Sequence, residues 1–510
     1  MLAAVNSLII TGIEARPVKV EVDIQNGLPA FEIVGLASTA IKEARERVRS
    51  AIKNSGFKFP GRRIIVNLAP ADLKKEGSHL DLPIALGILK ASEQINNDIP
   101  SDYYWAGELS LDGNLRRVPG IMAMALELAY SQQDKVLVIP EENEKEAGLV
   151  PEIRSFYATH LRQVVACIEG EETLSPVNPT QIKSNPEKKY DFAEVKGQET
   201  AKRALLIAAA GMHNVLLIGP PGGGKTMLAR RLPGILPPMQ REEILETTRI
   251  YSVANLLTPK NPIITERPFR APHKNASSSS IIGGGRIPKP GEISLAQNGV
   301  LFLDELPEFS RDVLEAMRQP LEDRMVTVAR AHSTHIFPAN FMLICSMNPC
   351  PCGNFGSDLE CRCSPLQIQR YLSRISGPLL DRIDLHIEVP RVKYEQLSEK
   401  RSGESSASLQ EKVAAAREIQ RKRFSSLQIK LNSQMGPAEV KKYCQLDEKS
   451  EQLFKTAFNK LNLNARSHDR ILKVARTIAD LEGSKSIQIH HLSEAIQYRS
   501  LDRKYWGHNI

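Results

Sequence analysis

The sequence has no long uninterrupted apolar run. No stretch approaches the roughly 18 consecutive apolar residues that a membrane-spanning helix needs, which excludes an integral membrane protein of the helical type. Residues 1–16, MLAAVNSLIITGIEAR, also lack the basic start of a secretory signal peptide. We therefore expect a first strand there, and no membrane partner.

Aromatic residues are scarce, at 5% of the chain. This scarcity argues against a surface built mainly from platforms on which nucleic-acid bases stack. The net charge is +8 and the isoelectric point is about 9.0, which permits a nucleic-acid partner without establishing one. Any such partner would be bound mainly through its phosphates.

Cysteines are few and odd in number, seven in 510 residues, which disfavours a disulfide framework and fits the reducing cytoplasm. Four of them follow the pattern C-x-C-x8-C-x-C: Cys350, Cys352, Cys361 and Cys363. Four thiolates so close together can complete a tetrahedral metal site. The pattern favours a structural Zn²⁺ site without a catalytic role. The alternative is four free thiols in a turn rich in proline and glycine.

The chain length predicts about three domains. Residues 1–170 combine a helical pattern that ends near Gly56 with strand-like runs at 18–24, 31–36, 62–70 and 134–140. Residues 171–190 contain three prolines and indicate a linker. Strand and helix patterns alternate over 191–392, which predicts an α/β domain with a doubly wound parallel sheet. Residues 393–510 are polar at first and then helical.

A phosphate-binding motif lies between an apolar strand, NVLLI, and a helix-forming run. It fits G-x-x-x-x-G-K-[ST] and consists of Gly219, Pro220, Pro221, Gly222, Gly223, Gly224, Lys225 and Thr226. The glycines let backbone N–H groups approach the phosphates, and the helix start adds positive potential. We expect Lys225 to reach the terminal phosphates of a nucleotide and the Thr226 hydroxyl to bind Mg²⁺.

Two further strands end in polar residues of the kind that nucleotide hydrolysis needs. GVLFLDE ends in Asp304, which would hold Mg²⁺ through water, and Glu305, which would deprotonate the attacking water. FMLICSMN ends in Asn348, at the place of a sensor for the γ-phosphate. Asparagine also suits an ordinary turn after a strand, so this third signal is weak alone.

The order of these motifs resembles the AAA+ ATPases. The segments RPFRAPHKNASSSSIIGGG, GVLFLDELPEF, SMNPCPCG, RISGPLLDRIDLHIEVP and NARSHDRILKVARTIADLEG are similar to the Mg-chelatase-like ATPases. GLPAFEIVGL and VNLAPADLKKEGSHLDLPIALGIL resemble the ComM/YifB competence-protein branch of that family. The resemblance covers nearly the whole chain. It implies ATP and Mg²⁺ as cofactors, an AAA+ core and a C-terminal helical lid.

Two arginines acquire roles through this resemblance. Arg382 matches the arginine finger, which reaches the ATP of a neighbouring subunit, and thereby implies an oligomer. The alternative is a surface arginine paired with Asp381 or Asp384. Arg466 matches the sensor 2 arginine of the lid, and Arg470 is the competing candidate one helical turn later.

The N-terminal segment WAGELSLDGNLRRVPGIMAMALELA resembles the proteolytic domain of Lon, which implies a Lon-like α+β fold for residues 1–170. In Lon, a serine and a lysine form the catalytic pair. Here His79, next to Ser78, occupies the serine position, and Met122 occupies the lysine position. Methionine cannot act as a base, so we predict no peptidase activity.

Two basic segments are candidates for DNA contact. A long segment separates Lys225 from Asp304, and its middle is rich in serine and glycine and carries Lys274, Arg286 and Lys289. Residues 326–341 alternate like a β-hairpin, with Arg330 and His332 near the tip. The resemblance places both segments in a ring pore, where they would contact phosphates. The alternative for each residue is ordinary surface charge.

The family resemblance implies a hexameric ring that uses ATP to move single-stranded and branched DNA. In the ComM branch such a helicase promotes branch migration during recombination, and so helps to integrate DNA in natural transformation, with recombination proteins as further partners. Three alternatives stay open. The first is a Mg-chelatase motor subunit, although that family lacks the N-terminal domain and the cysteine cluster. The second is a protein-remodelling ATPase or Lon-type protease. The third is a nucleotide-switched DNA-binding scaffold.

Overall fold

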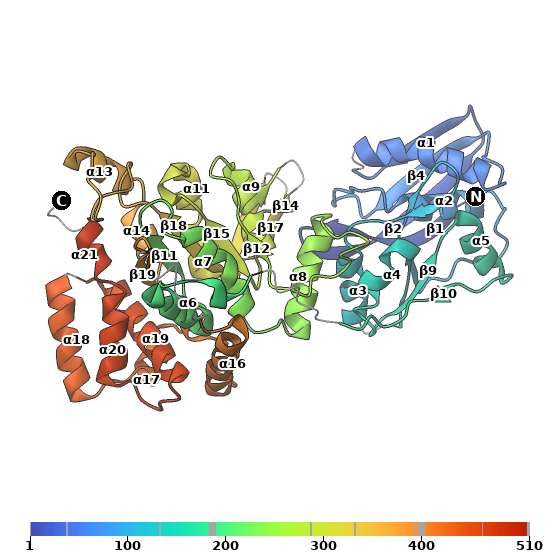
Figure 1. The fold of residues 1–510 in the computed structure, drawn as a ribbon. Helices are drawn as coiled ribbons and strands as arrows, with labels where there is room; N and C mark the ends of the chain where they lie inside the picture. Colours follow the sequence, from blue (N-terminus) through green and yellow to red (C-terminus); the bar gives the residue numbers. More distant parts are fainter. Residues whose placement is uncertain are drawn as a thin grey trace. The chain divides into compact units, whose positions relative to one another are not determined.

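Two compact units make up the computed structural model (Figure 1). The first comprises residues 1–183, 240–265 and 288–290, and the second comprises 184–239, 266–287 and 291–510. The described residues are 2–36, 39–131, 134–182, 190–285, 288–330, 333–392, 394–395, 403–461 and 463–506. The predicted α/β class, with a parallel-sheet core and a helical C-terminal region, is confirmed.

An eight-stranded mixed sheet forms the centre of the first unit. Apolar and polar residues alternate along its strands, so that Val18, Val20 and Val22 are buried on one face. The order in space is β10 (Ser175–Pro176), β9 (Arg154–Ala158), β8 (Val136–Pro140), β5 (Tyr103–Trp105), β1 (Leu2–Thr11), β2 (Glu14–Gln25), β4 (Arg63–Ala69) and β3 (Ala30–Val34). The four strand-like runs of the sequence correspond to β2, β3, β4 and β8. A short separate ladder pairs β6 (Glu108–Leu109) with β7 (Leu115–Arg116).

Helices pack on this sheet through their apolar residues. Helix α2 is buried along nearly its whole length because it is almost entirely apolar, and it lies against β1 and β2. The α-helices of the unit are α1 (Thr39–Asn54), α2 (Asp81–Ala91), α3 (Ile121–Tyr130), α4 (Glu144–Ala147), α5 (Leu161–Glu169) and α8 (Arg241–Val253).

Helix α8 belongs to the first unit although its residues fall within the predicted ATPase domain. Its Ser252 hydroxyl accepts a hydrogen bond from the Gly120 N–H (2.9 Å) and donates one to the Glu146 carboxylate. The same carboxylate accepts the Met122 N–H at 2.8 Å and the Asn143 amide at 3.0 Å. Burial raises the pKa of Glu146, and these donors oppose that rise. The buried network fastens α8 to the start of α3.

The two positions that resemble the Lon catalytic pair lie in the core of the first unit. Met122 is 0% exposed, and His79 is 2% exposed. Burial lowers the pKa of His79 to about 4, so its imidazole is neutral at physiological pH. Neither residue is presented to a substrate, and the absence of peptidase activity stays a prediction.

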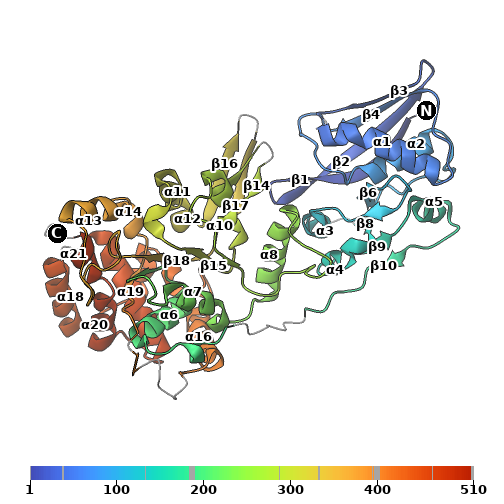
Figure 2. The same cartoon turned by 45° about the horizontal axis from the view of Figure 1, so that its top comes forward.

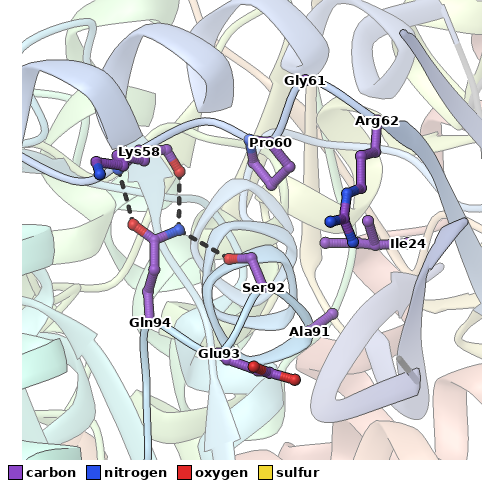
Figure 3. Close-up of a pocket in the computed structure, with 9 residues that line it drawn as sticks. All are labelled: Ile24, Lys58, Pro60, Gly61, Arg62, Ala91, Ser92, Glu93 and Gln94. Atoms are coloured by element: carbon purple, nitrogen blue, oxygen red, sulfur yellow. Dashed lines mark hydrogen bonds between the residues drawn. The ribbon is translucent and has the colours of Figure 1, made fainter. Parts of the chain in front are cut away.

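A shallow pocket of about 480 Å³ lies on the first unit, with Lys58 and Arg62 among its lining residues (Figure 3). Gln94 closes part of it, because its amide bonds the Lys58 backbone at 2.7 and 2.8 Å and the Ser92 hydroxyl at 2.8 Å. Glu93 adds a carboxylate to the same lining. The mixed charges give no single ligand class.

A five-stranded sheet forms the core of the second unit, and each of its strands pairs in parallel with its neighbours. The order is β12 (Phe269–Arg270), β15 (Val300–Leu303), β18 (Met342–Met347), β11 (Val215–Ile218) and β19 (Leu385–Glu388). Because the strands are parallel, their carboxyl ends meet at one edge of the sheet. The predicted hairpin is confirmed as β16 (Met325–Arg330) and β17 (Ser333–Pro338).

Helices complete the second unit (Figure 2). One apolar core joins α6, α16 and α19 to strands β11, β15, β18 and β19. Those of the ATPase region are α6 (Glu199–Gly211), α7 (Lys225–Arg231), α9 (Ser278–Ile282), α10 (Glu292–Leu295), α11 (Arg311–Ala316), α12 (Arg318–Asp323), α13 (Pro365–Leu372) and α14 (Gly377–Leu380). The C-terminal helices are α16 (Ser406–Arg423), α17 (Pro437–Tyr443), α18 (Glu448–Leu461), α19 (Ala465–Leu481), α20 (Ile489–Gln497) and α21 (Leu501–Trp506).

Part of the predicted linker, 171–190, belongs to the first unit. Strand β10 pairs with β9, and the Thr180 N–H donates to the Gly148 carbonyl at 2.8 Å. The remaining domain boundaries stay a prediction.

Candidate ATP site

The phosphate-binding loop, 219–226, joins β11 to α7 at the carboxyl edge of the parallel sheet. Gly222 and Gly224 have φ angles of 77° and 86°, in the left-handed region that glycine adopts without strain. At Gly219, a Cβ would lie 2.0 Å from the Val389 carbonyl oxygen. The local geometry therefore requires glycine at these three positions.

The Lys225 side chain lies across this loop. Its Nζ donates to the carbonyl oxygens of Gly219 (2.6 Å) and Pro220 (2.9 Å) and to Asn348 Oδ1 (3.1 Å). Burial lowers the pKa of Lys225, while the negative charges of Asp304 and Glu305 oppose that shift. The three direct acceptors are uncharged, so they do not neutralise the Lys225 ammonium, which can still pair with a bound anion. The structure thus brings the predicted lysine and the predicted sensor together.

Asp304, directly after β15, faces two hydroxyl groups. Thr226 Oγ1 donates to Asp304 Oδ2 at 3.0 Å, and Ser346 Oγ donates to Oδ1. Hydroxyl and carboxylate oxygens are the donors that Mg²⁺ prefers, so Thr226 and Asp304 fit the predicted metal site. The sequence did not identify Ser346 as a residue of this site. Its signal was its place near the end of β18, two residues before Asn348, which follows the strand.

Glu305 sits in a strained turn next to this site. Its φ of 55° lies in the left-handed region, which costs a residue with a Cβ about 1 kcal/mol. Its carboxylate accepts the Lys274 ammonium at 2.6 Å, and both side chains are partly exposed. This hydrogen bond raises the pKa of Lys274. One of the residues predicted to contact DNA is therefore paired with the predicted catalytic base.

Arg382 lies at the opposite edge of the sheet from the phosphate-binding loop of its own chain. Its carbonyl accepts the Asn214 amide at 3.0 Å, and Asn214 comes just before β11, whereas the loop follows β11. The guanidinium is buried, donates to the Pro378 carbonyl at 2.7 Å and pairs with Glu322. The pairing alternatives that the sequence offered, Asp381 and Asp384, were therefore both wrong.

Arg466 and Arg470 lie on the first turns of α19 and differ in their surroundings. Arg470 pairs with Asp384, which also accepts the Asn214 N–H at 3.0 Å. Burial alone would raise the pKa of Asp384, but Arg470 and His213 hold it far below its usual range. Arg466 is exposed. Arg470 already neutralises a buried carboxylate, and the charge of Arg466 acts on Glu322, so the choice between the two as the sensor 2 arginine stays a prediction.

The other residues predicted to contact DNA are described unequally. Lys289 is exposed in β14 (Lys289–Pro290). Arg330 is described only as the last residue of β16, and Arg286 and His332 lie outside the described residues. Their contact with DNA stays a prediction.

The four clustered cysteines converge in the structure. Their Sγ atoms all lie within 4.8 Å of one another, and three of the separations are 3.4, 3.7 and 3.8 Å. A tetrahedral ZnS₄ centre with Zn–S bonds of about 2.3 Å has S···S edges of about 3.8 Å. Disulfides are about 2.05 Å long, so these distances fit shared metal coordination better than bonded sulfur pairs. Cys350, Cys352, Cys361 and Cys363 thus suit Zn²⁺.

Three family models match most of the chain. Residues 191–397 match "Magnesium chelatase, subunit ChlI", 403–499 match its C-terminal model, and 20–143 match "Subunit ChlI of Mg-chelatase". Competence protein ComM of Haemophilus influenzae is 47% identical over 508 residues, which cover 98% of each chain. The chain belongs to the ComM/YifB family of Mg-chelatase-like AAA+ ATPases. YifB of Salmonella typhimurium is also 47% identical, over 504 residues and 98% of each chain.

A chelatase subunit is similar to only part of this chain. Magnesium-chelatase subunit ChlI of Nephroselmis olivacea is 22% identical over 333 residues, covering 60% of this chain and 86% of its own. Among the described residues, no helix is long and apolar enough to cross a membrane.

Proposed function

We propose that the chain is an ATP-driven DNA motor that acts as a hexameric ring in the cytoplasm. It hydrolyses ATP with Mg²⁺ and moves single-stranded and branched DNA, promoting branch migration of recombination intermediates. The proposed biological role is to help integrate single-stranded DNA during natural transformation. Full-length similarity to a competence protein supports this role.

The observation that carries the proposal is the division of the hydrolytic residues between two edges of one sheet. Lys225, Asp304 and Asn348 converge at the carboxyl edge, joined by the hydrogen bonds described above. Arg382 lies at the amino edge and so cannot reach the same nucleotide. A ring solves this geometry, because each subunit can offer Arg382 to the ATP site of its neighbour.

A link between DNA and hydrolysis is supported by the Lys274–Glu305 ion pair. Lys274 belongs to the basic segment after β12, and DNA phosphates would compete with Glu305 for its ammonium. Release of Glu305 would leave its carboxylate available to accept a proton from water. DNA binding would then raise the rate of ATP hydrolysis.

The direct test is steady-state ATP hydrolysis by the purified full-length chain. We expect single-stranded DNA or a four-way junction to raise the rate several-fold over protein alone, because DNA competes for Lys274. Duplex DNA serves as the comparison substrate. Equal rates with and without every DNA would contradict the DNA-motor proposal and leave the ATPase assignment standing.

Replacing Lys274 by alanine is expected to raise the rate without DNA by about two- to fivefold and to reduce stimulation by DNA. The expected change is small because water screens an ion pair between exposed side chains. Lys455→Ala, a change at an exposed lysine on α18, controls for loss of charge. An unchanged basal rate in Lys274→Ala would show that the ion pair does not restrain Glu305.

A Mg-chelatase-type motor subunit is the second candidate, favoured by the names of the three matching family models. In that case hydrolysis would respond to partner chelatase subunits and not to DNA. A protein-remodelling role has no comparable support among the observations above.

A further inference from the structure

The cysteine cluster lies directly beside the ATP site. One residue, Pro349, separates the sensor Asn348 from Cys350. Because the proline ring fixes φ, the backbone between Asn348 and Cys350 has little conformational freedom. Asn348 Oδ1 in turn accepts the Lys225 ammonium. The position of Cys350 therefore determines where the sensor side chain meets the phosphate-binding lysine.

The same segment also touches the phosphate-binding loop. Gly353 has a φ of 82°, and a Cβ at this position would lie 2.5 Å from Cδ of Pro221. This approach is closer than real Cβ contacts allow, so the Gly353 backbone lies directly against the proline ring. The cysteine segment therefore contacts the nucleotide site at a second point, in addition to its link through Pro349.

On its other side the segment is held by the C-terminal helix α21. The Phe355 ring meets the Tyr505 ring edge-on, with centroids 6.3 Å apart. The neighbouring Lys504 ammonium bonds Glu388 Oε1, at the end of β19, at 2.6 Å. The segment thus bridges the phosphate-binding loop and the last described helix of the chain.

Residues 350–363 are held in shape by their sulfur atoms together with a few turn hydrogen bonds, such as that from the Asn354 amide to the Glu360 carbonyl at 3.3 Å. Among them there is no helix or strand, and most of the side chains after Cys350 are exposed or half-buried. The sulfurs themselves accept backbone N–H groups, including Phe355 N–H to Cys350 Sγ at 3.3 Å. Such donors orient the ligands of a metal site and are typical of its surroundings. In segments with little regular secondary structure, metal binding is coupled to folding.

We propose that Cys350, Cys352, Cys361 and Cys363 bind one Zn²⁺ that fixes the sensor segment against the phosphate-binding loop, so that tight ATP binding requires zinc. The centre is structural, because four thiolates complete the coordination of zinc and leave no open position. The proposal rests on the ATP site described above. It adds that loss of the metal weakens ATP binding at Lys225.

The first test removes the metal from wild-type protein. Zinc is counted by mass spectrometry, displaced with a mercurial reagent and a chelator, and restored after thiol regeneration. We expect about one zinc per chain, consistent with a single four-thiolate site. Affinity for a fluorescent ATP analogue should fall at least about tenfold without zinc and recover with Zn²⁺ but not Mg²⁺. Zinc-free protein that binds the analogue within twofold of native would overturn the proposal, as would protein that neither contains nor takes up zinc.

A matched pair of variants tests the contact without touching a ligand. Gly353→Ala places a Cβ against Pro221, whereas at Gly356 (φ 73°) the nearest atom to a new Cβ is the flexible Lys504 side chain, 3.5 Å away. Both substitutions impose similar backbone strain. We expect both variants to retain zinc and only Gly353→Ala to lose affinity for the analogue, by about five- to tenfold. Equal affinities in the two would contradict transmission through Pro221.

Two controls separate this proposal from the proposed function. Lys225→Ala should lose ATP binding and keep its zinc, because it alters the nucleotide site alone. Cys167→Ser, at a half-buried cysteine of the first unit, should change neither. If wild-type protein with zinc fails to bind the analogue at all, the proposed ATP function fails. If it binds equally well with and without zinc, only the present proposal fails.

Discussion

Replacing Glu305 by glutamine is expected to lower the steady-state rate of ATP hydrolysis at least about a hundredfold. Glutamine keeps the size of the side chain but cannot accept a proton from the attacking water, and general-base catalysis contributes about 10²- to 10⁴-fold. Lys225, Thr226 and Asp304 remain in place, so affinity for ATP should stay within about threefold of wild type. Phosphate release and binding of a fluorescent ATP analogue measure the two quantities.

The partner of Glu305 supplies the control for this experiment. In Lys274→Ala the carboxylate is retained and its ion pair is lost, so activity should rise and not fall. A double variant, Glu305→Gln with Lys274→Ala, should be as inactive as Glu305→Gln alone. Residual activity in Glu305→Gln above about a tenth of wild type would mean that another group deprotonates the water.

Replacing Arg382 by alanine is expected to lower the rate of ATP hydrolysis by about 10³-fold or more, the range measured for arginine fingers. The guanidinium would stabilise the charge that spreads over the transferring phosphoryl group. Since Arg382 lies at the opposite sheet edge from its own ATP site, the loss should be rescued by a neighbour. Mixing Arg382→Ala with Lys225→Ala subunits should restore a measurable rate, because one supplies the ATP site and the other supplies the arginine.

Arg382 also has an internal role that must be separated from a catalytic one. In the structure it is buried and paired with Glu322, and this hydrogen bond lowers the pKa of Glu322. Glu322→Gln removes the charge of the partner and keeps the guanidinium. If Glu322→Gln loses as much activity as Arg382→Ala, with the same fall in melting temperature, the arginine is structural. Failure of the mixed subunits to regain activity would contradict action between neighbours.

The sequence predicted best what is continuous along the chain. The phosphate-binding loop and the β16–β17 hairpin each follow a local pattern, glycine spacing in one and alternation in the other. Parallel pairing then requires that Asp304 and Asn348 meet near Lys225, since each follows a strand of the same sheet. The cysteine cluster could be predicted equally well, because all four residues lie within 350–363.

Contacts between distant residues could not be predicted in this way. The Lys274–Glu305 ion pair and the Arg382–Glu322 ion pair depend on how loops fold back over the sheet edges. No periodicity marks the partner of a charged side chain in a loop. Helix α8 is a similar case, because its amphipathic pattern indicates a helix but not the unit against which it packs.

Helix α8 has a consequence for how the two units can be inherited and studied. The chain enters the second unit, and it returns to the first for residues 240–265 and again for residues 288–290. A shortened chain that begins after the proline-rich segment would lack the rest of the first unit. The partly buried Leu245, Val253 and Ile263 of residues 240–265 would then be exposed to water. The complementary fragment would leave the buried Glu146 carboxylate without the Ser252 hydroxyl. Neither half is therefore a freestanding module, and a gene fusion or split between them would have to carry α8 with the N-terminal piece.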